Sequence, residues 1–148
     1  MNNKIPPPIV ALICGLSIYF SRPAFPTIQG SWSGPAALVL LTLGTGFLVS
    51  AVLSFKRQRT TVNPLQPEKA SSLVITGLFK YSRNPMYLGM LLLLLAVTAD
   101  FNVIGGLLIT LGFLVFMTKF QIIPEERALE SKFGEKFAQY KGQTRRWL

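Results

Sequence analysis

The sequence contains no histidine and only one cysteine, Cys14, among its 148 residues. Without histidine the chain can build neither a histidine-based catalytic triad nor a histidine metal site, and one cysteine cannot replace those ligands. A single cysteine also cannot form an internal disulfide. The missing residue types therefore exclude the common triad and metal chemistries, and we expect no metal partner.

Charged residues are also scarce, at 14% of the chain, whereas 50% of the residues are hydrophobic. This balance is typical of a membrane protein rather than of a small soluble domain. The net charge of +9 could indicate nucleic acid, but the basic residues fall between and after the hydrophobic segments rather than in one stripe. We therefore expect membrane lipid with anionic headgroups as the partner, and no nucleic acid. The length suits one domain, residues 1–148.

Four apolar segments predict an all-α integral membrane protein with four transmembrane helices. They cover about residues 5–20, 34–55, 85–99 and 102–123. The second segment has no charged residue and is the clearest span. The first would rise roughly 24 Å as a helix, short of the ~30 Å of bilayer hydrocarbon. A signal peptide is the alternative for that segment, but the residues that follow make a poor cleavage site.

Only the sequence ADFN connects the third and fourth segments. So short a connection predicts a tight antiparallel helical hairpin. Asp100 is then expected near the headgroups, where it would cap the fourth helix. In the second segment, Gly44 and Gly46 are expected to permit close helix packing.

The distribution of Lys and Arg predicts the orientation. The connection 56–84 and the region from residue 119 onward carry most of the basic residues: Lys56, Arg57, Arg59, Lys69, Lys80, Arg83, Lys119, Arg127, Lys132, Lys136, Lys141, Arg145 and Arg146. The two opposite loops hold only Arg22. By the positive-inside rule, both termini, the connection 56–84 and the tail 124–148 face the cytoplasm, in what we expect to be a bacterial inner membrane.

The tail is expected to form one cytoplasmic amphipathic helix. Pro124 suits its first position, and Leu129, Phe133, Phe137 and Tyr140 repeat on one face. Such a helix would lie at the membrane surface.

The stretch KYSRNPMYLG, residues 80–89, places polar residues directly before a run of leucines. Asn84 suits a helix N-cap and Pro85 the first helical position, and tyrosines are common at membrane interfaces. These roles leave Arg83 and the length of the preceding connection unexplained, which favours a binding role for this region. The helix start would also be a natural seat for a carboxylate or phosphate.

The sequence GLFKYSRNPMYLG, followed across the hairpin by PEERALESKFGEKFAQYK, resembles a family of integral membrane methyltransferases. This family includes isoprenylcysteine carboxyl methyltransferase and the phospholipid methyltransferases. The matching pattern is G-x-Y-x-x-x-R-H-P-x-Y, then E-E-x-x-L and F-G-x-x-Y-x-x-Y, over roughly residues 60–141. The sequence departs from it at Phe79 and Asn84, where the family has tyrosine and histidine, and at Gln121, where it has arginine.

The resemblance implies S-adenosylmethionine as methyl donor, with S-adenosylhomocysteine as product. The residues that it implies for the cofactor site are Ser71, Ser72, Leu73, Val74, Phe79, Asn84, Pro85, Met86, Tyr87 and Glu125. It places Gln121, a candidate catalytic residue, on the acceptor side. Arg83 is the other candidate catalytic residue, since its charge could hold the donor's carboxylate. The implied acceptor is lipophilic or amphipathic: an isoprenylcysteine-like carboxylate, a phospholipid amine or a small thiol.

Two alternatives from other classes remain. Small four-helix transporters have a similar size, although they need an ionisable residue within a span, and none of the four segments carries an acid at its centre. A non-catalytic scaffold that binds anionic lipid is the other alternative. It predicts that Arg83 and Glu125 can be replaced without consequence beyond lipid affinity.

Overall fold

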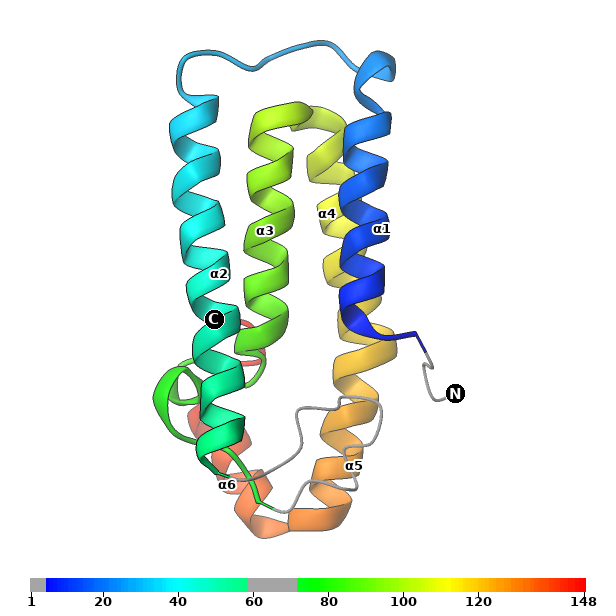
Figure 1. Cartoon of the computed structure of the whole chain (residues 1–148). Helices are drawn as coiled ribbons and strands as arrows, with labels where there is room; N and C mark the ends of the chain where they lie inside the picture. The colour runs from blue at the N-terminus through cyan, green and yellow to red at the C-terminus, as the bar shows by residue number, and fades with distance from the viewer. Residues whose placement is uncertain (1–4, 59–71) are drawn as a thin grey trace.

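The computed structural model describes residues 5–58 and 72–148. Over these residues the chain is helical and contains no strand, which confirms the predicted all-α class. The elements in chain order are α1 (Pro7–Phe20), η1 (Arg22–Ala24), α2 (Ser33–Arg57), η3 (Gly77–Lys80), α3 (Pro85–Phe101), α4 (Val103–Met117), η4 (Thr118–Ile122), α5 (Ile123–Phe133) and α6 (Glu135–Gln143) (Figure 1).

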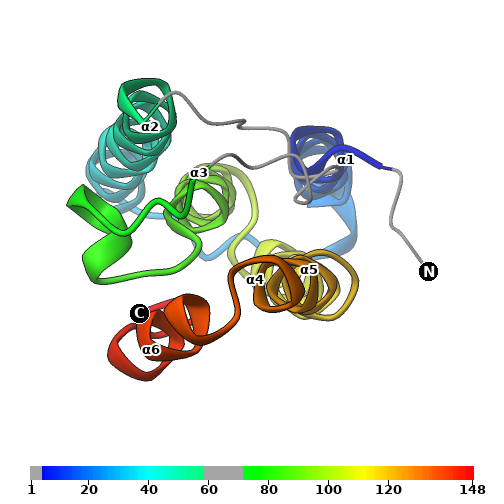
Figure 2. The same cartoon turned by 90° about the horizontal axis from the view of Figure 1, so that it is seen from below.

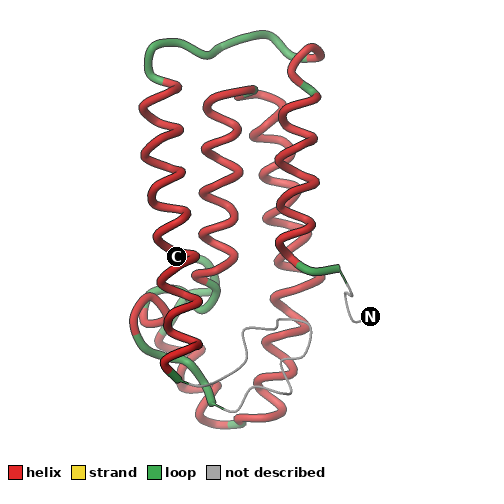
Figure 3. The backbone as a smooth tube through the Cα atoms, in the orientation of Figure 1, coloured by secondary structure: helices red, strands yellow, loops and turns green. Residues whose placement is uncertain are grey.

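Helices α1 to α4 stand side by side, and α3 lies at the centre of the group. It packs against α1, α2 and α4 (Figures 1 and 2). The connection between α1 and α2 crosses one end of the bundle, next to the α3–α4 turn. At the other end, α5 extends beyond α4, and α6 turns back beside the segment that precedes α3 (Figure 3). We call these the hairpin end and the α5–α6 end.

The outer surface of the bundle is strongly apolar. Exposed large hydrophobic side chains on α1, α2 and α4 include Leu12, Ile13, Phe20, Leu38, Val39, Leu107, Leu108 and Leu111. Two described helices, Ser33–Arg57 and the continuous stretch Val103–Phe133, are long and apolar enough to cross a membrane, and α1 and α3 are shorter apolar helices. So much exposed apolar surface suits lipid better than water. The four-span topology stays a prediction.

Small residues set the closest approach between helices. A Cβ on Gly44 of α2 would lie 2.9 Å from the Gly89 carbonyl oxygen of α3, and a Cβ on Gly89 would lie 2.9 Å from that of Gly44. The backbones therefore touch at this crossing. The prediction for Gly44 is confirmed, whereas that for Gly46 is wrong, since nothing lies within 4 Å of a Cβ there.

The predicted hairpin between α3 and α4 is confirmed, but its cap is a different residue. Helix α3 continues through Asp100 to Phe101, beyond the expected end near residue 99, and Asp100 is exposed in its last turn. Asn102 alone separates the helices, and its side chain accepts a hydrogen bond from the Gly105 N–H at 3.0 Å. The prediction that Asp100 caps α4 is therefore wrong, because Asp100 is itself helical.

The tail does not form one separate helix, as the sequence pattern predicted. Helix α4 runs through the π-helical turn η4 into α5, so Pro124 lies within a continuous helical stretch. Pro124 has no N–H for the usual bond four residues back, and the wider turn just before it accommodates that loss. Helix α5 ends at Phe133, and the next residue, Gly134, has a φ of 53° that favours glycine. The chain then turns into α6, which buries Phe137 and Tyr140.

Candidate functional site

Tyr87 and Glu125 meet at the α5–α6 end although they lie far apart in sequence. Tyr87 is buried in the first turn of α3, and Glu125 lies in the first turn of α5. The Tyr87 hydroxyl donates a hydrogen bond to Glu125 Oε2 at 2.8 Å. Gln121, buried in η4, interacts with the same hydroxyl. The structure thus brings together three of the residues predicted from sequence, and we call them the Tyr87 cluster.

Local structure explains this meeting. Pro85 occupies the first position of α3, as predicted, so that Tyr87 projects from its first turn. Gln121 and Glu125 lie four residues apart in one continuous helical stretch, and they therefore occupy neighbouring turns.

The Glu125 carboxyl group is half-buried, and burial raises its pKa to about 7. The hydrogen bond from Tyr87 opposes this rise, while the nearby charge of Glu126 adds to it. Glu125 therefore changes protonation near neutral pH, and a cationic or hydrogen-bonding ligand would favour its ionised form.

Glu126 has the opposite environment, between two arginines. Arg83 donates from Nε and Nη2 to Glu126 Oε1 at 3.1 and 2.9 Å, and Arg146 donates from Nη2 to Oε2 at 2.8 Å. Burial alone would raise the pKa of Glu126, but the hydrogen bonds and charges of Arg146 and Arg83 outweigh it and hold that pKa below its ordinary value. We call Arg83, Glu126 and Arg146 the arginine clamp.

Residues 144–147 extend the clamp along the start of α3, and we call them the strap. The Arg83 N–H donates to the Arg145 carbonyl at 2.9 Å, and an isolated parallel bridge joins Ser82 to Arg145. The Arg83 guanidinium also donates to the Thr144 carbonyl. Trp147 Nε1 donates to Thr118 Oγ1 at 3.1 Å, and the Trp147 ring packs against the main hydrophobic core. The strap thereby ties η4 to the residues before α3.

The Asn84 and Arg83 side chains therefore have partners that the sequence pattern did not predict. Asn84 stands at the N-cap position of α3, as predicted, but its side chain makes no capping hydrogen bond. Its side-chain amide instead donates to the Arg146 carbonyl at 2.9 Å. Arg83 is largely buried and holds the clamp. Direct contact of either residue with a cofactor or acceptor stays a prediction.

The other predicted cofactor residues form a second group against α2. Val74 and Phe79 are buried with Ala51, and Phe79 packs edge to face on Phe55 at a centroid distance of 5.2 Å. Met86 packs against both this group and the main core, and so lies between them.

Two of the remaining predicted residues lie on the same chain segment. Ser72 and Leu73 are half-buried, and the Ser72 hydroxyl donates to the Gln58 carbonyl at 3.4 Å. Ser71 lies outside the described residues.

Sequence reasoning missed Glu126, Arg146 and the strap as parts of this end of the molecule. The sequence pattern assigns no role to Glu126, and it counts Arg146 only as a positive charge on the cytoplasmic side. The single available signal was a tryptophan directly after two arginines, which is unusual for a solvated tail.

Comparison with known proteins agrees with the sequence resemblance. The profile of the phospholipid methyltransferase family matches residues 32–136, a range that contains the Tyr87 cluster but not the strap. An uncharacterised protein of Haemophilus influenzae is 47% identical over 66 residues, which cover 43% of this chain and 100% of that protein. No solved structure matches the chain.

Proposed function

The chain belongs to the phospholipid methyltransferase family, and from this premise we propose that it transfers a methyl group from S-adenosylmethionine to a lipophilic or amphipathic acceptor in the membrane. Family membership implies methyltransferase activity in general. The identity of the donor, the membrane topology and the class of acceptor are our proposals.

The hydrogen bond between Tyr87 and Glu125 carries this proposal, because it joins two halves of the family pattern at one place. Bound S-adenosylmethionine would supply a methyl group on a sulfonium cation. The Glu125 carboxylate suits a ribose hydroxyl or the donor's ammonium group, and the Tyr87 ring suits a cation or an adenine face. These side chains therefore fit the chemical groups of the donor.

Methyl transfer does not require a histidine. The reaction is a direct displacement, which mainly requires the two reacting atoms to be held in line at about 3–3.5 Å and away from water. The clamp and the strap would fix the start of α3 and hence the position of Tyr87. We propose that positioning supplies most of the catalysis.

We further propose that α1, α2, α3 and α4 all cross the membrane, with the α5–α6 end and both termini in the cytoplasm. The apolar outer surface and the excess of Lys and Arg at this end support that placement. It would place the Tyr87 cluster where a bundle of apolar helices meets water, within reach of molecules dissolved in the bilayer.

The acceptor is then a phospholipid amine, an isoprenylcysteine-like carboxylate or a small thiol. Gln121 carries no charge with which to hold a carboxylate, and this favours the amine or the thiol. Incubating the protein with labelled S-adenosylmethionine and a membrane extract, and identifying the labelled product, would decide among the three.

Calorimetric titration of the detergent-purified protein with S-adenosylmethionine and S-adenosylhomocysteine tests the cofactor site. Tyr87→Phe removes only the hydroxyl, and Glu125→Gln removes only the charge. Each should weaken binding roughly tenfold, the expected effect of losing one charge-assisted hydrogen bond.

Matched controls are available in the segment before α3 and in α5. Tyr81, at 72% exposure, and Glu130, which forms an exposed ion pair with Lys141, lie outside the Tyr87 cluster. Tyr81→Phe and Glu130→Gln should bind like the unmodified protein. If the folded protein bound neither compound, the cofactor proposal would be wrong; if Tyr87→Phe and Glu125→Gln bound normally, these two residues would not form the site.

A further inference from the structure

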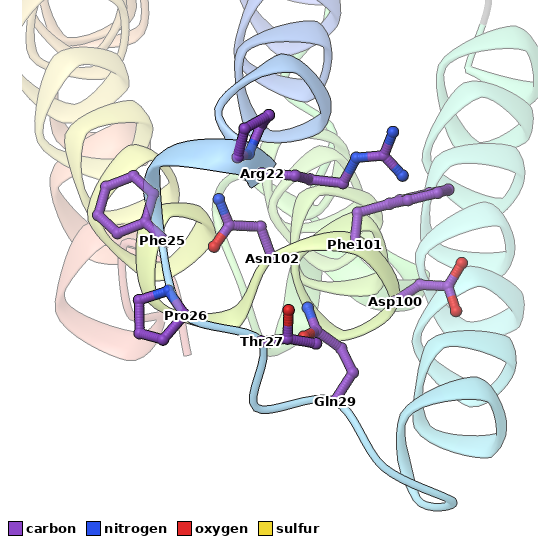
Figure 4. Close-up of a pocket in the computed structure, with 9 residues that line it drawn as sticks. Arg22, Phe25, Pro26, Thr27, Gln29, Asp100, Phe101 and Asn102 are labelled. Atoms are coloured by element: carbon purple, nitrogen blue, oxygen red, sulfur yellow. The ribbon is translucent and has the colours of Figure 1, made fainter.

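A cavity of about 430 Å³ opens at the hairpin end, opposite the Tyr87 cluster. It lies between the connection that follows α1 and the turn between α3 and α4 (Figure 4). Its lining residues are Arg22, Pro23, Phe25, Pro26, Thr27, Gln29, Asp100, Phe101 and Asn102. The volume lies within the usual range for small-molecule sites, about 300–1,000 Å³.

Both charges of the hairpin end line this cavity. Arg22 is the single charged residue of segment 21–32, and Asp100 is the single charged residue of segment 100–102. The three ion pairs among the described residues all involve other side chains. A cation and an anion that line one cavity without pairing with each other suit a ligand that carries both charges.

The cation is held in place by its own neighbours. Arg22 Nε donates to the Tyr19 carbonyl at 3.1 Å, and the guanidinium lies 4.0 Å from the Tyr19 ring centroid and 5.5 Å from that of Phe101. Contacts of this kind orient an arginine and reduce the entropy lost when it binds an anion. Figure 4 shows Phe101 between the labelled Arg22 and Asp100.

The wall of the cavity is anchored to the helices. The Asn102 amide donates to Ser21 Oγ at 3.1 Å while its oxygen caps α4. A Cβ on Gly105 would lie 2.7 Å from the Phe25 ring, so Phe25 packs directly on the α4 backbone. The connection is therefore docked on the hairpin, and the cavity is built by side chains from both.

From this arrangement we propose that the cavity binds the headgroup of a zwitterionic phospholipid with a primary ammonium, its phosphodiester on Arg22 and its ammonium on Asp100. Exposed Phe20, Ile28 and Trp32 nearby in the chain provide apolar surface for the acyl chains. This site is separate from the Tyr87 cluster. It rests on the membrane placement proposed above and does not depend on methyl transfer.

Native mass spectrometry tests the proposal. The full chain is mixed with defined lipids in micelles, and the lipid that stays bound after release from the micelle is measured. The probes are phosphatidylethanolamine, phosphatidylglycerol and phosphatidylcholine with identical acyl chains. We expect phosphatidylethanolamine to be retained roughly tenfold better than the other two, because only it offers both a phosphate and an N–H-bearing cation. Arg22→Gln should reduce retention of all three lipids. Asp100→Asn should abolish the preference for phosphatidylethanolamine and leave the phosphate contact.

Arg57→Gln, which removes one exposed positive charge at the other end, is the control and should retain the preference. Soluble phosphoethanolamine tests whether the ligand is a lipid or a free headgroup. If phosphoethanolamine bound as tightly as phosphatidylethanolamine, the ligand would not be a lipid. An unchanged preference in both Arg22→Gln and Asp100→Asn would overturn the site. S-adenosylmethionine binding by the same variants should be normal, so that a failure here is distinguishable from a failure of the proposed methyl transfer.

Discussion

Each end of the bundle has an asparagine directly before a helix, and the two asparagines act differently. Asn102, at the hairpin end, caps α4 through Gly105 and donates to Ser21. Asn84, at the α5–α6 end, leaves α3 uncapped and donates to the carbonyl of Arg146, 62 residues away. The cap of α4 is thus local, between residues three apart in sequence, whereas the Asn84 side chain is held by a distant carbonyl that only the folded chain brings near. The variants below test this difference.

Breaking the clamp should have the largest effect. Glu126→Ala would leave the buried Arg83 guanidinium without its carboxylate and would also release Arg146. Loss of one partner of a buried ion pair typically costs about 3–5 kcal/mol. We therefore expect the free energy of unfolding, measured by denaturant titration in micelles, to fall by about this amount. Glu130→Ala, in an exposed ion pair, should change it by less than about 1 kcal/mol. Equal effects of the two variants would contradict the clamp.

The pH dependence of stability should separate Glu125 from Glu126. The pKa of Glu125 is raised from 4.5 to about 7 in the folded protein, so that the folded state binds more protons between these values. Stability from this group is complete below about pH 4.5 and is lost as the pH rises through 7, by up to about 3 kcal/mol. Glu126, with a lowered pKa, contributes with the opposite sign: its stabilisation is present above its unfolded pKa and is lost at more acid pH.

Unfolding titrations from pH 4.5 to 8 measure the Glu125 effect. In Glu125→Gln the free energy of unfolding should decline less as the pH rises through this range, whereas Glu130→Gln should show the same decline as the unmodified protein. A decline unchanged in Glu125→Gln would show that another group causes it.

Aspartate substitutions should distinguish the two asparagines. Asn102→Ala loses the cap, at about 1–2 kcal/mol, and Asn102→Asp should recover most of it, because a carboxylate accepts from Gly105 and favours a helix start. Asn84→Asp should be no more stable than Asn84→Ala. The aspartate has no N–H to donate to the Arg146 carbonyl, and it places a carboxylate against that oxygen. Thermal unfolding of the four variants measures the contrast, and recovery at both positions would contradict the assigned roles.

The smallest effect is expected at the strap. Trp147→Phe keeps an aromatic ring but removes the Nε1–H that bonds to Thr118, at a cost of about 1 kcal/mol. Thr118→Val removes the same bond from the other side. The double variant should therefore be little worse than either single variant in the same unfolding measurement. Fully additive losses would argue against the hydrogen bond.

The sequence pattern predicted which segments are helical better than it predicted which residues cap those helices. The long apolar stretches predicted α2 and the α3–α4 hairpin, because hydrophobic runs and very short connections allow few alternatives. The start of α3 at Pro85 was also correct. The assignment of Asp100 as a cap failed because α3 continues through it. Asn84 does occupy the N-cap position, but its side chain donates to the strap instead of accepting from the helix.

In the candidate site, the family pattern implied Tyr87 and Glu125 for the cofactor and Gln121 for the acceptor, and the structure brings these three side chains together. The pattern assigned no role to Glu126. The two acids are adjacent in sequence, and both are glutamates. Their environments differ because successive residues of a helix point in different directions. One carboxyl group faces Tyr87, and the other faces two arginines.

The sequence by itself determined that this chain is helical, apolar and a member of a methyltransferase family, because these properties depend on composition, local periodicity and short motifs. Only the tertiary structure decided which polar side chains meet. The clamp, the strap and the cavity at the hairpin end all join residues from distant segments, and their pairings depend on how the helices pack. Packing buries the Glu125 carboxyl group, which raises its pKa, and places two arginines against Glu126, which lower the pKa of that carboxyl group.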